Sequence, residues 1–152
     1  MIQIAIMGLG TVGTGVAKVV AENAKQIEHK LGEPLQVKTI LVRHFKDGPY
    51  RQLMTDDFKK IEEDDDIRVV VETIGGVEAA YEYTKRALMA GKHVVTANKQ
   101  LVAEHGCELL ELNAPLRISV GEDGKVNGLV VQPQIIGEVK RGRPSPRPAD
   151  KP

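Results

Sequence analysis

The sequence predicts an α/β fold: a doubly wound parallel sheet with helices packed on both faces. From Ile2 to about Asn113, short runs rich in valine and isoleucine alternate with longer segments whose apolar residues recur at helical spacing. The apolar runs are bounded by Gly, Pro, Asp or Asn, as strand ends usually are. Strands that alternate with helices in this order form a parallel sheet through right-handed crossover connections.

Strands and helices alternate in a regular order before residue 113. The expected strands cover residues 2–7, 35–43, 67–74 and 93–97. The expected helices cover residues 12–31, 55–64, 77–92 and 99–112. Thr55 is placed to cap the second helix, and Gly32 and Gly91 stand where helix C-caps are expected.

The character of the chain changes after Asn113. The segment PLRISV predicts one more strand, and the turn-rich GEDGKVNG predicts a hairpin that leads into LVVQPQIIGEV. Residues 140–152 are basic and proline-rich without apolar periodicity, so disorder is expected there. We therefore expect a folded domain over residues 1–120 and a divergent tail over 121–152, largely disordered from residue 140.

Composition argues against several classes of protein. The 152 residues include 21 Lys plus Arg and 21 Asp plus Glu, and a net charge of zero argues against a nucleic-acid partner. No apolar run approaches the roughly 20 residues of a membrane helix, and no signal-peptide pattern opens the chain. The lone Cys107 allows no internal disulfide, and the acidic run 62–66 lacks the spacing of a calcium loop, so no metal is expected. These features predict a cytoplasmic domain.

A glycine turn directly follows the first expected strand and opens the first helix. Residues 8–13, GLGTVG, match G-x-G-x-x-G. In this motif the first glycine allows a tight turn, the second lets the backbone approach a pyrophosphate, and the third lets the helix pack close to the strand. The unpaired N–H groups and positive dipole end of the helix then face the phosphates. This context predicts a Rossmann-type dinucleotide site; an ordinary glycine-rich turn and a site for another adenosyl ligand are the alternatives.

The second expected strand bears on the choice of cofactor. NAD sites usually place Asp or Glu at the end of this strand, where it bonds the ribose 2′-hydroxyl group. Here the strand ends in LVRH, and Arg43 stands without an acid beside it. An arginine can pair bidentately with a 2′-phosphate, and Lys46 and Arg51 add positive charge nearby. The sequence favours NADP over NAD, with a solvated strand-end arginine as the alternative.

Longer motifs relate the chain to a known family. The opening GLGTVGTGV, the LVR of the second strand and the stretch VVVETIGGVEAAYEYTKRALMAGKHVVTANKQLVAEHG together resemble the N-terminal cofactor domain of homoserine dehydrogenase. The resemblance covers roughly residues 2–112. It implies an NAD(P)-dependent oxidoreductase that interconverts aspartate 4-semialdehyde and homoserine by hydride transfer, in amino-acid biosynthesis leading to threonine and methionine.

The resemblance also implies which residues form the site. It places Lys99 at the cofactor and the reacting centre, where an ammonium group would stabilise negative charge on a carbonyl oxygen. A solvated lysine at a helix start is the alternative. The cofactor-binding residues carried over by motif are Gly8, Gly10, Thr11, Val12, Gly13, Arg43, Ile74, Gly75, Gly76, Thr96 and Lys99.

The resemblance stops near Gly121. In the family a further region supplies the acid–base lysine, the acidic residues that hold homoserine and a monovalent metal site, and the residues after Gly121 do not resemble it. One hypothesis is the NAD(P)-binding domain of a homoserine dehydrogenase-like enzyme, truncated before the catalytic region, with its activity alone left open. The alternative is a stand-alone, non-catalytic NADP(H)-binding module. A third hypothesis attributes the tail to a shifted reading frame or a fusion.

The expected partners are small molecules: the cofactor, and aspartate 4-semialdehyde or homoserine. Nucleic acids and membranes are not expected. In the family the last helix of this domain packs on the catalytic region. Without that cover, Leu109, Leu112 and Leu116 are expected to be exposed, which predicts self-association.

Overall fold

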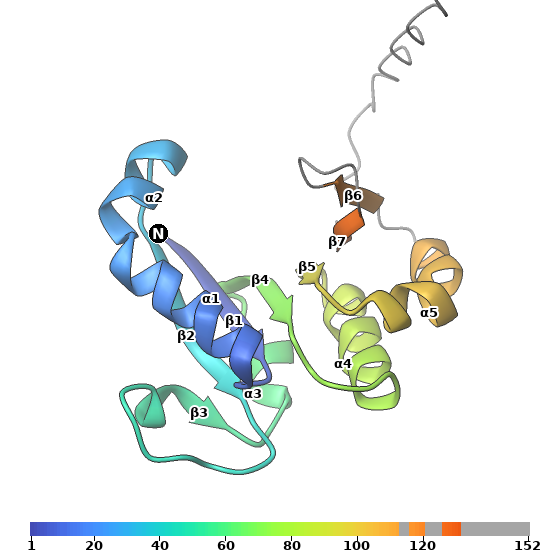
Figure 1. Cartoon of the computed structure of the whole chain (residues 1–152), viewed down its shortest axis with the longest axis horizontal. Helices are drawn as coiled ribbons and strands as arrows, with labels where there is room; N and C mark the ends of the chain where they lie inside the picture. The colour runs from blue at the N-terminus through green and yellow to red at the C-terminus, as the bar shows by residue number, and fades with distance from the viewer. Residues whose placement is uncertain (113–115, 121–125, 132–152) are drawn as a thin grey trace, which may run out of the picture.

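A single sheet with helices on both sides forms the core of the molecule (Figure 1). The computed structural model describes residues 1–112, 116–120 and 126–131. The strands are β1 (Ile2–Met7), β2 (Leu35–Leu41), β3 (Met54–Thr55), β4 (Ile67–Glu72), β5 (His93–Thr96), β6 (Leu116–Val120) and β7 (Val126–Val131). The helices are α1 (Thr11–Glu22), α2 (Ala24–Leu31), α3 (Lys59–Glu62), α4 (Glu78–Met89) and α5 (Lys99–Glu111), with a 3-10 turn, η1 (Arg51–Leu53).

The strand order is β3-β2-β1-β4-β5-β7-β6, and the pairings from β3 to β5 are all parallel. From β1 the chain first adds strands on one side and then crosses to add β4 and β5 on the other. The gap between the carboxyl ends of β1 and β4 is therefore the topological switch point, where open α/β sheets bind their ligands. The predicted doubly wound fold class is confirmed.

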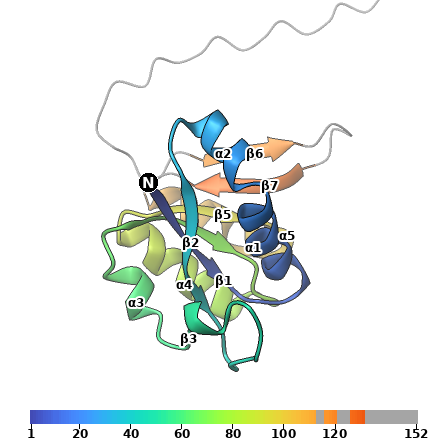
Figure 2. The same cartoon turned by 90° about the vertical axis from the view of Figure 1, so that its left-hand side faces the viewer.

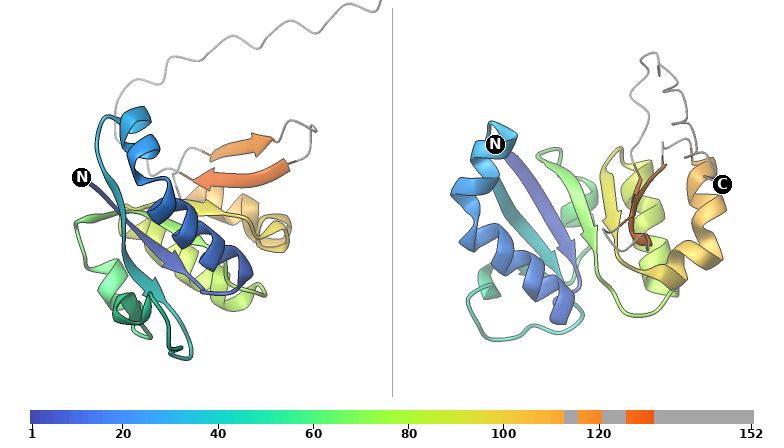
Figure 3. Two further views of the ribbon diagram at one scale, coloured as in Figure 1. Left: turned by 60° about the vertical axis from the view of Figure 1, so that its left-hand side comes forward. Right: turned by 45° about the horizontal axis from the view of Figure 1, so that its top comes forward.

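Alternating side chains of β1 supply both layers of the core. Ile4 and Ile6 pack on one face with the inner side of α1, including Val20. Ala5 and Met7 pack on the other face with α3, α4 and α5. The left panel of Figure 3 shows α1 in front of the strands and α4 behind them. The last four residues of β1, Ile4–Met7, are buried and all apolar, because this part of the strand is covered on both faces; the polar Gln3 lies before them, where the strand is only half-buried.

Two strands end two residues earlier than the sequence predicts. β2 stops at Leu41 rather than at residue 43, and β4 stops at Glu72 rather than at residue 74. The next residues leave the ladder to turn over the carboxyl edge of the sheet. Arg43 and Ile74 therefore lie in loops at the switch point.

The first helical segment is divided at Asn23. A continuous helix over residues 12–31 was expected, but Asn23 leaves the helical conformation (φ −106°, ψ 18°) and separates α1 from α2. Its backbone N–H and its side-chain Nδ2 both donate to the carbonyl oxygen of Val19, each at 3.0 Å. Asparagine side chains compete with helical hydrogen bonding in this way. Gly32 caps α2 with φ +79°, as predicted.

The prediction of a helix from Thr55 is wrong. Thr55 instead ends β3, a two-residue edge strand paired with β2, and the helix α3 is confined to Lys59–Glu62. The Thr55 hydroxyl accepts from the N–H of Asp57 at 3.1 Å, and the Asp57 carboxylate accepts from the N–H of Lys59 at 3.0 Å. These local bonds form turns in place of the first helical turn. They bring Asp56 just beyond the end of β3, beside the loop that follows β2.

The expected extra strand and hairpin are present as β6 and β7. They pair antiparallel, and β7 pairs antiparallel with β5 (Figure 2). The connection 121–125 and residues 132–152, including the expected disordered segment, lie outside the described residues. The division into a domain over 1–120 and a tail over 121–152 stays a prediction.

The exposure expected for Leu109 is wrong. This side chain is fully buried in the core shared with α4, and Leu112 packs partly buried against the same cluster. The period of α5 turns Leu109 inward with Leu101, toward the sheet rather than away from it. The side chain of Leu116 lies outside what is described. In the described part of the chain, no helix is long and apolar enough to cross a membrane.

Candidate cofactor-binding site

A cavity of about 490 Å³ lies at the carboxyl edge of the sheet, at the switch point. Its walls come from the loops after β1, β2, β3 and β4 and from the first turns of α4. The lining residues are Gly8, Leu9, Gly10, Leu41, Val42, Arg43, His44, Lys46, Asp56, Thr73, Ile74, Gly75, Ala79 and Tyr83.

The glycine turn has no room for side chains at its first and third glycines. Gly8 has φ +96°, and a Cβ atom there would lie 2.9 Å from the carbonyl oxygen of Thr73. A Cβ atom on Gly13 would lie 2.0 Å from the carbonyl oxygen of Gly8. A Cβ atom on Gly10, in contrast, would meet nothing within 4 Å. The first and third glycines serve the fold, while the second leaves an open backbone surface toward the cavity.

Thr73 holds this turn against the end of β4. Its hydroxyl donates to the carbonyl oxygens of Met7 and Gly8, each at 3.0 Å. Its backbone N–H also donates to Met7 at 2.9 Å, and the N–H of Gly8 donates to the carbonyl oxygen of Leu41 at 2.9 Å. The turn is thus tied to both neighbours of β1. Sequence analysis missed Thr73, although a hydroxyl residue directly after a buried strand is a recognisable signal.

Within the described residues, no side chain caps the N-terminus of α1. Its N-cap is Gly10, which has no side chain to accept a hydrogen bond, and its first turn contains no acidic residue. Thr11 and Val12 are exposed there. The unpaired N–H groups and the positive end of the helix dipole suit an anionic group such as a pyrophosphate.

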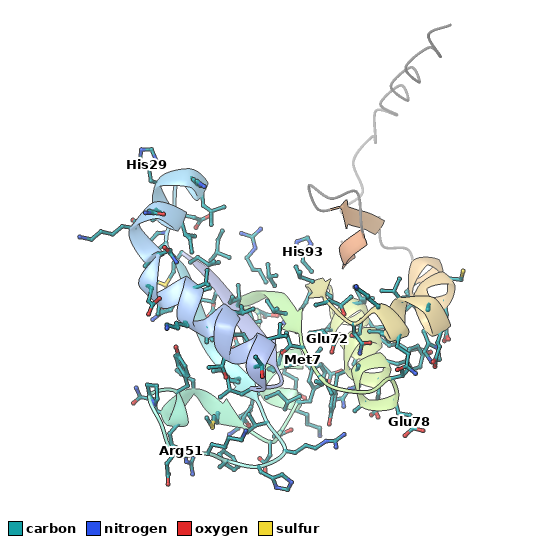
Figure 4. All side chains as sticks on the ribbon, in the orientation of Figure 1. Met7, His29, Arg51, Glu72, Glu78 and His93 are labelled. Carbon is teal, nitrogen blue, oxygen red and sulfur yellow. The ribbon has the colours of Figure 1, made fainter. Side chains whose placement is uncertain are left out.

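Basic side chains gather on the wall formed by the loop after β2. Arg43, His44 and Lys46 all line the cavity. Asp56 faces the same space from the loop after β3, where the pairing of β3 with β2 places it. Arg51, the first residue of η1 (labelled in Figure 4), is not among the lining residues, and its guanidinium lies 4.4 Å from the centre of the Phe45 ring.

The opposite wall is mainly apolar. It consists of Ile74 and Gly75 from the β4–α4 connection and of Ala79 and Tyr83, one turn apart on α4. Sequence analysis missed Ala79 and Tyr83. Their spacing of four residues marks one face of the helix, but only the packing of α4 shows that this face borders the cavity.

Asn98 joins the β5–α5 loop to the loop after β4. Its side-chain oxygen caps α5 by accepting from the N–H of Leu101 at 3.0 Å. Its Nδ2 atom donates to the carbonyl oxygens of Gly76 at 2.7 Å and Ile74 at 3.3 Å. Lys99 follows as the first residue of α5, exposed and outside the cavity lining.

Glu72 is a buried carboxylate at the end of β4, next to Met7 of β1 (Figure 4). It is 0% exposed and accepts from the N–H of Ile74 at 2.6 Å and from the Thr96 hydroxyl. Burial raises the pKa of Glu72 above its ordinary value, and the two hydrogen bonds oppose this shift. Thr96 is 2% exposed, and its oxygen also accepts from the N–H of Asn98 at 3.0 Å.

The structure brings only some of the sequence-predicted residues to the cavity wall. Gly8, Gly10, Arg43, Ile74 and Gly75 line it. The remaining predicted residues lie outside the cavity lining: Thr11, Val12 and Gly13 at the start of α1, Gly76 in the loop after β4, Thr96 at the end of β5 and Lys99 at the start of α5. Among the described residues, no group of three His, Cys, Asp or Glu side chains is arranged to hold a metal ion.

A doubly wound sheet with a glycine turn and a cavity at its switch point defines a Rossmann-type domain of the nicotinamide-dinucleotide-binding class. Residues 8–117 match the sequence profile of the family described as "Homoserine dehydrogenase, NAD binding domain". The chain is 36% identical to homoserine dehydrogenase of Corynebacterium glutamicum over 143 residues, which are 92% of the chain and 32% of that relative. It is 40% identical to the Bacillus subtilis homoserine dehydrogenase over 72% of the chain and 26% of that relative.

Solved structures agree with these sequence matches. Homoserine dehydrogenase from S. aureus at pH 7.0 superposes with a TM-score of 0.67 and 41% identity, over 73% of this chain and 29% of that one. The chain belongs to the homoserine dehydrogenase NAD-binding domain family. It spans about a third of the length of the curated relatives that it matches.

Substitution of two glycines in α1 tests the close approach at the glycine turn. Gly13→Ala should lower the free energy of unfolding by about 1–3 kcal/mol or more, because its methyl group overlaps the Gly8 carbonyl group. The matched control Gly15→Ala meets nothing within 4 Å and should raise it by about 0.5–1 kcal/mol. Urea denaturation measures both. A Gly13→Ala protein as stable as the wild type would contradict the packing described.

Proposed function

We propose that the chain binds a nicotinamide dinucleotide across its switch point. We propose further that it serves as the cofactor domain of an enzyme with homoserine dehydrogenase activity. In that activity aspartate 4-semialdehyde and homoserine are interconverted by hydride transfer. The observation that carries the proposal is the N-terminus of α1, which is neither capped by a side chain nor neutralised by an acid and which begins beside the cavity. The glycine turn and the first residues of α1, Thr11, Val12 and Gly13, hold the pyrophosphate.

Arg43, Lys46 and His44 form the adenosine end of the proposed site and favour NADP. A guanidinium pairs with a phosphate through two parallel hydrogen bonds, which a ribose hydroxyl group cannot match. Asp56 lines the same cavity and is the nearest equivalent of the acid that NAD sites use. Two permanently charged basic groups, Arg43 and Lys46, against one carboxylate favour the cofactor that carries the extra phosphate.

Exchange of Arg43 tests this preference. Arg43→Ala should weaken NADPH binding about 10- to 100-fold, because a hydrogen bond to a charged group contributes about 1.5–3 kcal/mol, and should change NADH binding little. Arg51→Ala is the matched control, since Arg51 is outside the cavity lining. Calorimetric titration measures the NADPH and NADH affinities of the wild type and of both variants. Equal losses for both cofactors, or no loss for either, would contradict a role for Arg43 at the 2′-phosphate.

The proposed nicotinamide end lies at the loops after β4 and β5. Ile74, Gly75 and Gly76 let the backbone pass close to a ring, and Gly76 has φ +88° with open space where a Cβ atom would stand. Nicotinamide supplies the hydride when it is bound. Lys99, at the start of α5, provides an ammonium group for the negative charge that develops on the carbonyl oxygen of the aldehyde.

A stand-alone NADP(H)-binding module is the second candidate. The observation that favours it is the position of Lys99, which lies outside the cavity lining. Binding and hydride transfer are separable properties of such a domain, since transfer also requires a held substrate and a positioned proton donor.

A titration with homoserine separates the two candidates. We expect NADPH added to the purified chain to bind with enhanced nicotinamide fluorescence. Homoserine is then added to the NADP complex, and formation of NADPH is followed by its absorbance. Turnover supports the enzyme, because a module binds the cofactor without catalysis. Binding without turnover establishes a detached cofactor domain, which fits either the module or a domain that needs a further catalytic region. Failure to bind either NADPH or NADH would contradict both candidates.

Self-association is a separate proposal, and the burial of Leu109 removes part of its expected basis. Leu112 is only partly buried and remains a candidate contact. Sedimentation velocity over a wide concentration range measures the oligomeric state. We expect the average mass to rise with concentration; a monomer at every concentration would exclude self-association through this surface.

A further inference from the structure

Glu72 is an unusual residue for the end of a central strand. It is fully buried, in a strand otherwise composed of apolar residues and Arg68, and among the described residues it takes part in no ion pair. A buried carboxylate without a cation is costly to the fold unless hydrogen bonds satisfy it. The hydrogen bonds of Glu72 must therefore offset the free-energy cost of burying its carboxylate.

Those bonds close a ring of side chains and backbone between two loops. The Glu72 carboxylate binds the N–H of Ile74 and the hydroxyl of Thr96, and the Thr96 oxygen binds the N–H of Asn98. The Asn98 side chain returns to the carbonyl oxygen of Ile74 and also binds that of Gly76. We call Glu72, Thr96, Asn98 and the backbone of Ile74 the Glu72 ring.

The Glu72 ring lies at the point where the backbone pairing of β4 with β5 ends and the two following loops begin. Glu72 and Thr96 are the last partners in the parallel register of β4 with β5. Beyond them the chain departs toward α4 on one side and toward α5 on the other. Asn98 binds the carbonyl groups on both sides of Gly75, and Lys99 directly follows Asn98 in the chain. The ring therefore fixes the loop after β4 relative to the loop after β5.

We propose that Glu72 and Thr96 are positioning residues for the nicotinamide half of the cofactor: the Glu72 ring sets the loop at 74–76 and the start of α5 at one spacing. The inference rests on the proposed dinucleotide function. It assigns Thr96 an indirect part in binding, because its hydroxyl is already bonded on both sides within the protein. The adenosine end, built from the loops after β2 and β3, does not touch the Glu72 ring.

Thr96→Val removes the hydroxyl and keeps the shape of the side chain. Because only one end of the site depends on the ring, NADPH affinity should fall about three- to thirtyfold, the usual range for coupling through a packed network. Enhancement of nicotinamide fluorescence should fall with it. Affinity for adenosine 2′,5′-bisphosphate, which contains the adenosine end alone, should stay within twofold of the wild type. Thr96→Ser should restore NADPH binding.

Thr84→Val is the matched control. Thr84 is also fully buried, but its hydroxyl has no hydrogen-bond partner among the described residues, and this variant should bind both probes as the wild type does. If Thr96→Val fails to fold by circular dichroism, Glu72→Gln takes its place. An amide at this position can still accept from Ile74 but leaves the Thr96 hydroxyl without an acceptor.

Two outcomes would overturn the inference. One is wild-type NADPH affinity in a folded Thr96→Val protein. The other is an equal loss for NADPH and adenosine 2′,5′-bisphosphate, which would make the Glu72 ring a part of the fold alone. Failure of the proposed function gives a different result, since the wild-type chain would then bind neither probe.

Discussion

The close approach of Gly13 to the carbonyl group of Gly8 is the contact on which the rest of the site depends. It lets α1 begin at Thr11, directly over the end of β1, while Thr73 of the neighbouring loop ties the same turn to β4. A single methyl group at Gly13 would push the helix away. The N-terminal N–H groups of α1 would then no longer point toward the space between the loops, where we propose that the pyrophosphate binds.

Charge is divided between the framework and the cavity. The ion pairs among the described residues include those of Lys38 with Asp64 and Asp66 and of Arg86 with Glu62, which link separate elements of the framework. Lys38 lowers the pKa of the Asp64 carboxyl group, and Arg86 lowers that of Glu62. The basic groups that line the cavity take part in none of these pairs. Such uncommitted cations keep their full attraction for a phosphate ligand.

The two ends of the site differ in how they are held. The proposed adenosine end consists of exposed side chains on the long connection between β2 and β3. The nicotinamide end is formed by short loops that Asn98 and buried Glu72 join. This difference suits a dinucleotide. Binding does not require a rigid contact at the adenosine end, whereas hydride transfer at the nicotinamide end requires the reacting atoms to be held within a narrow range of distance.

The sequence by itself determined the alternating elements, the glycine turn and the position of Arg43 after the second strand, because periodicity and glycine geometry are local properties. Only the tertiary structure decided the features that join distant segments. The edge strand β3, which brings Asp56 to the cavity, forms because β2 offers a free edge. Leu109 is buried because α5 packs beside α4. The bond from Thr96 to Glu72 spans 24 residues, and no local pattern in either segment specifies its partner.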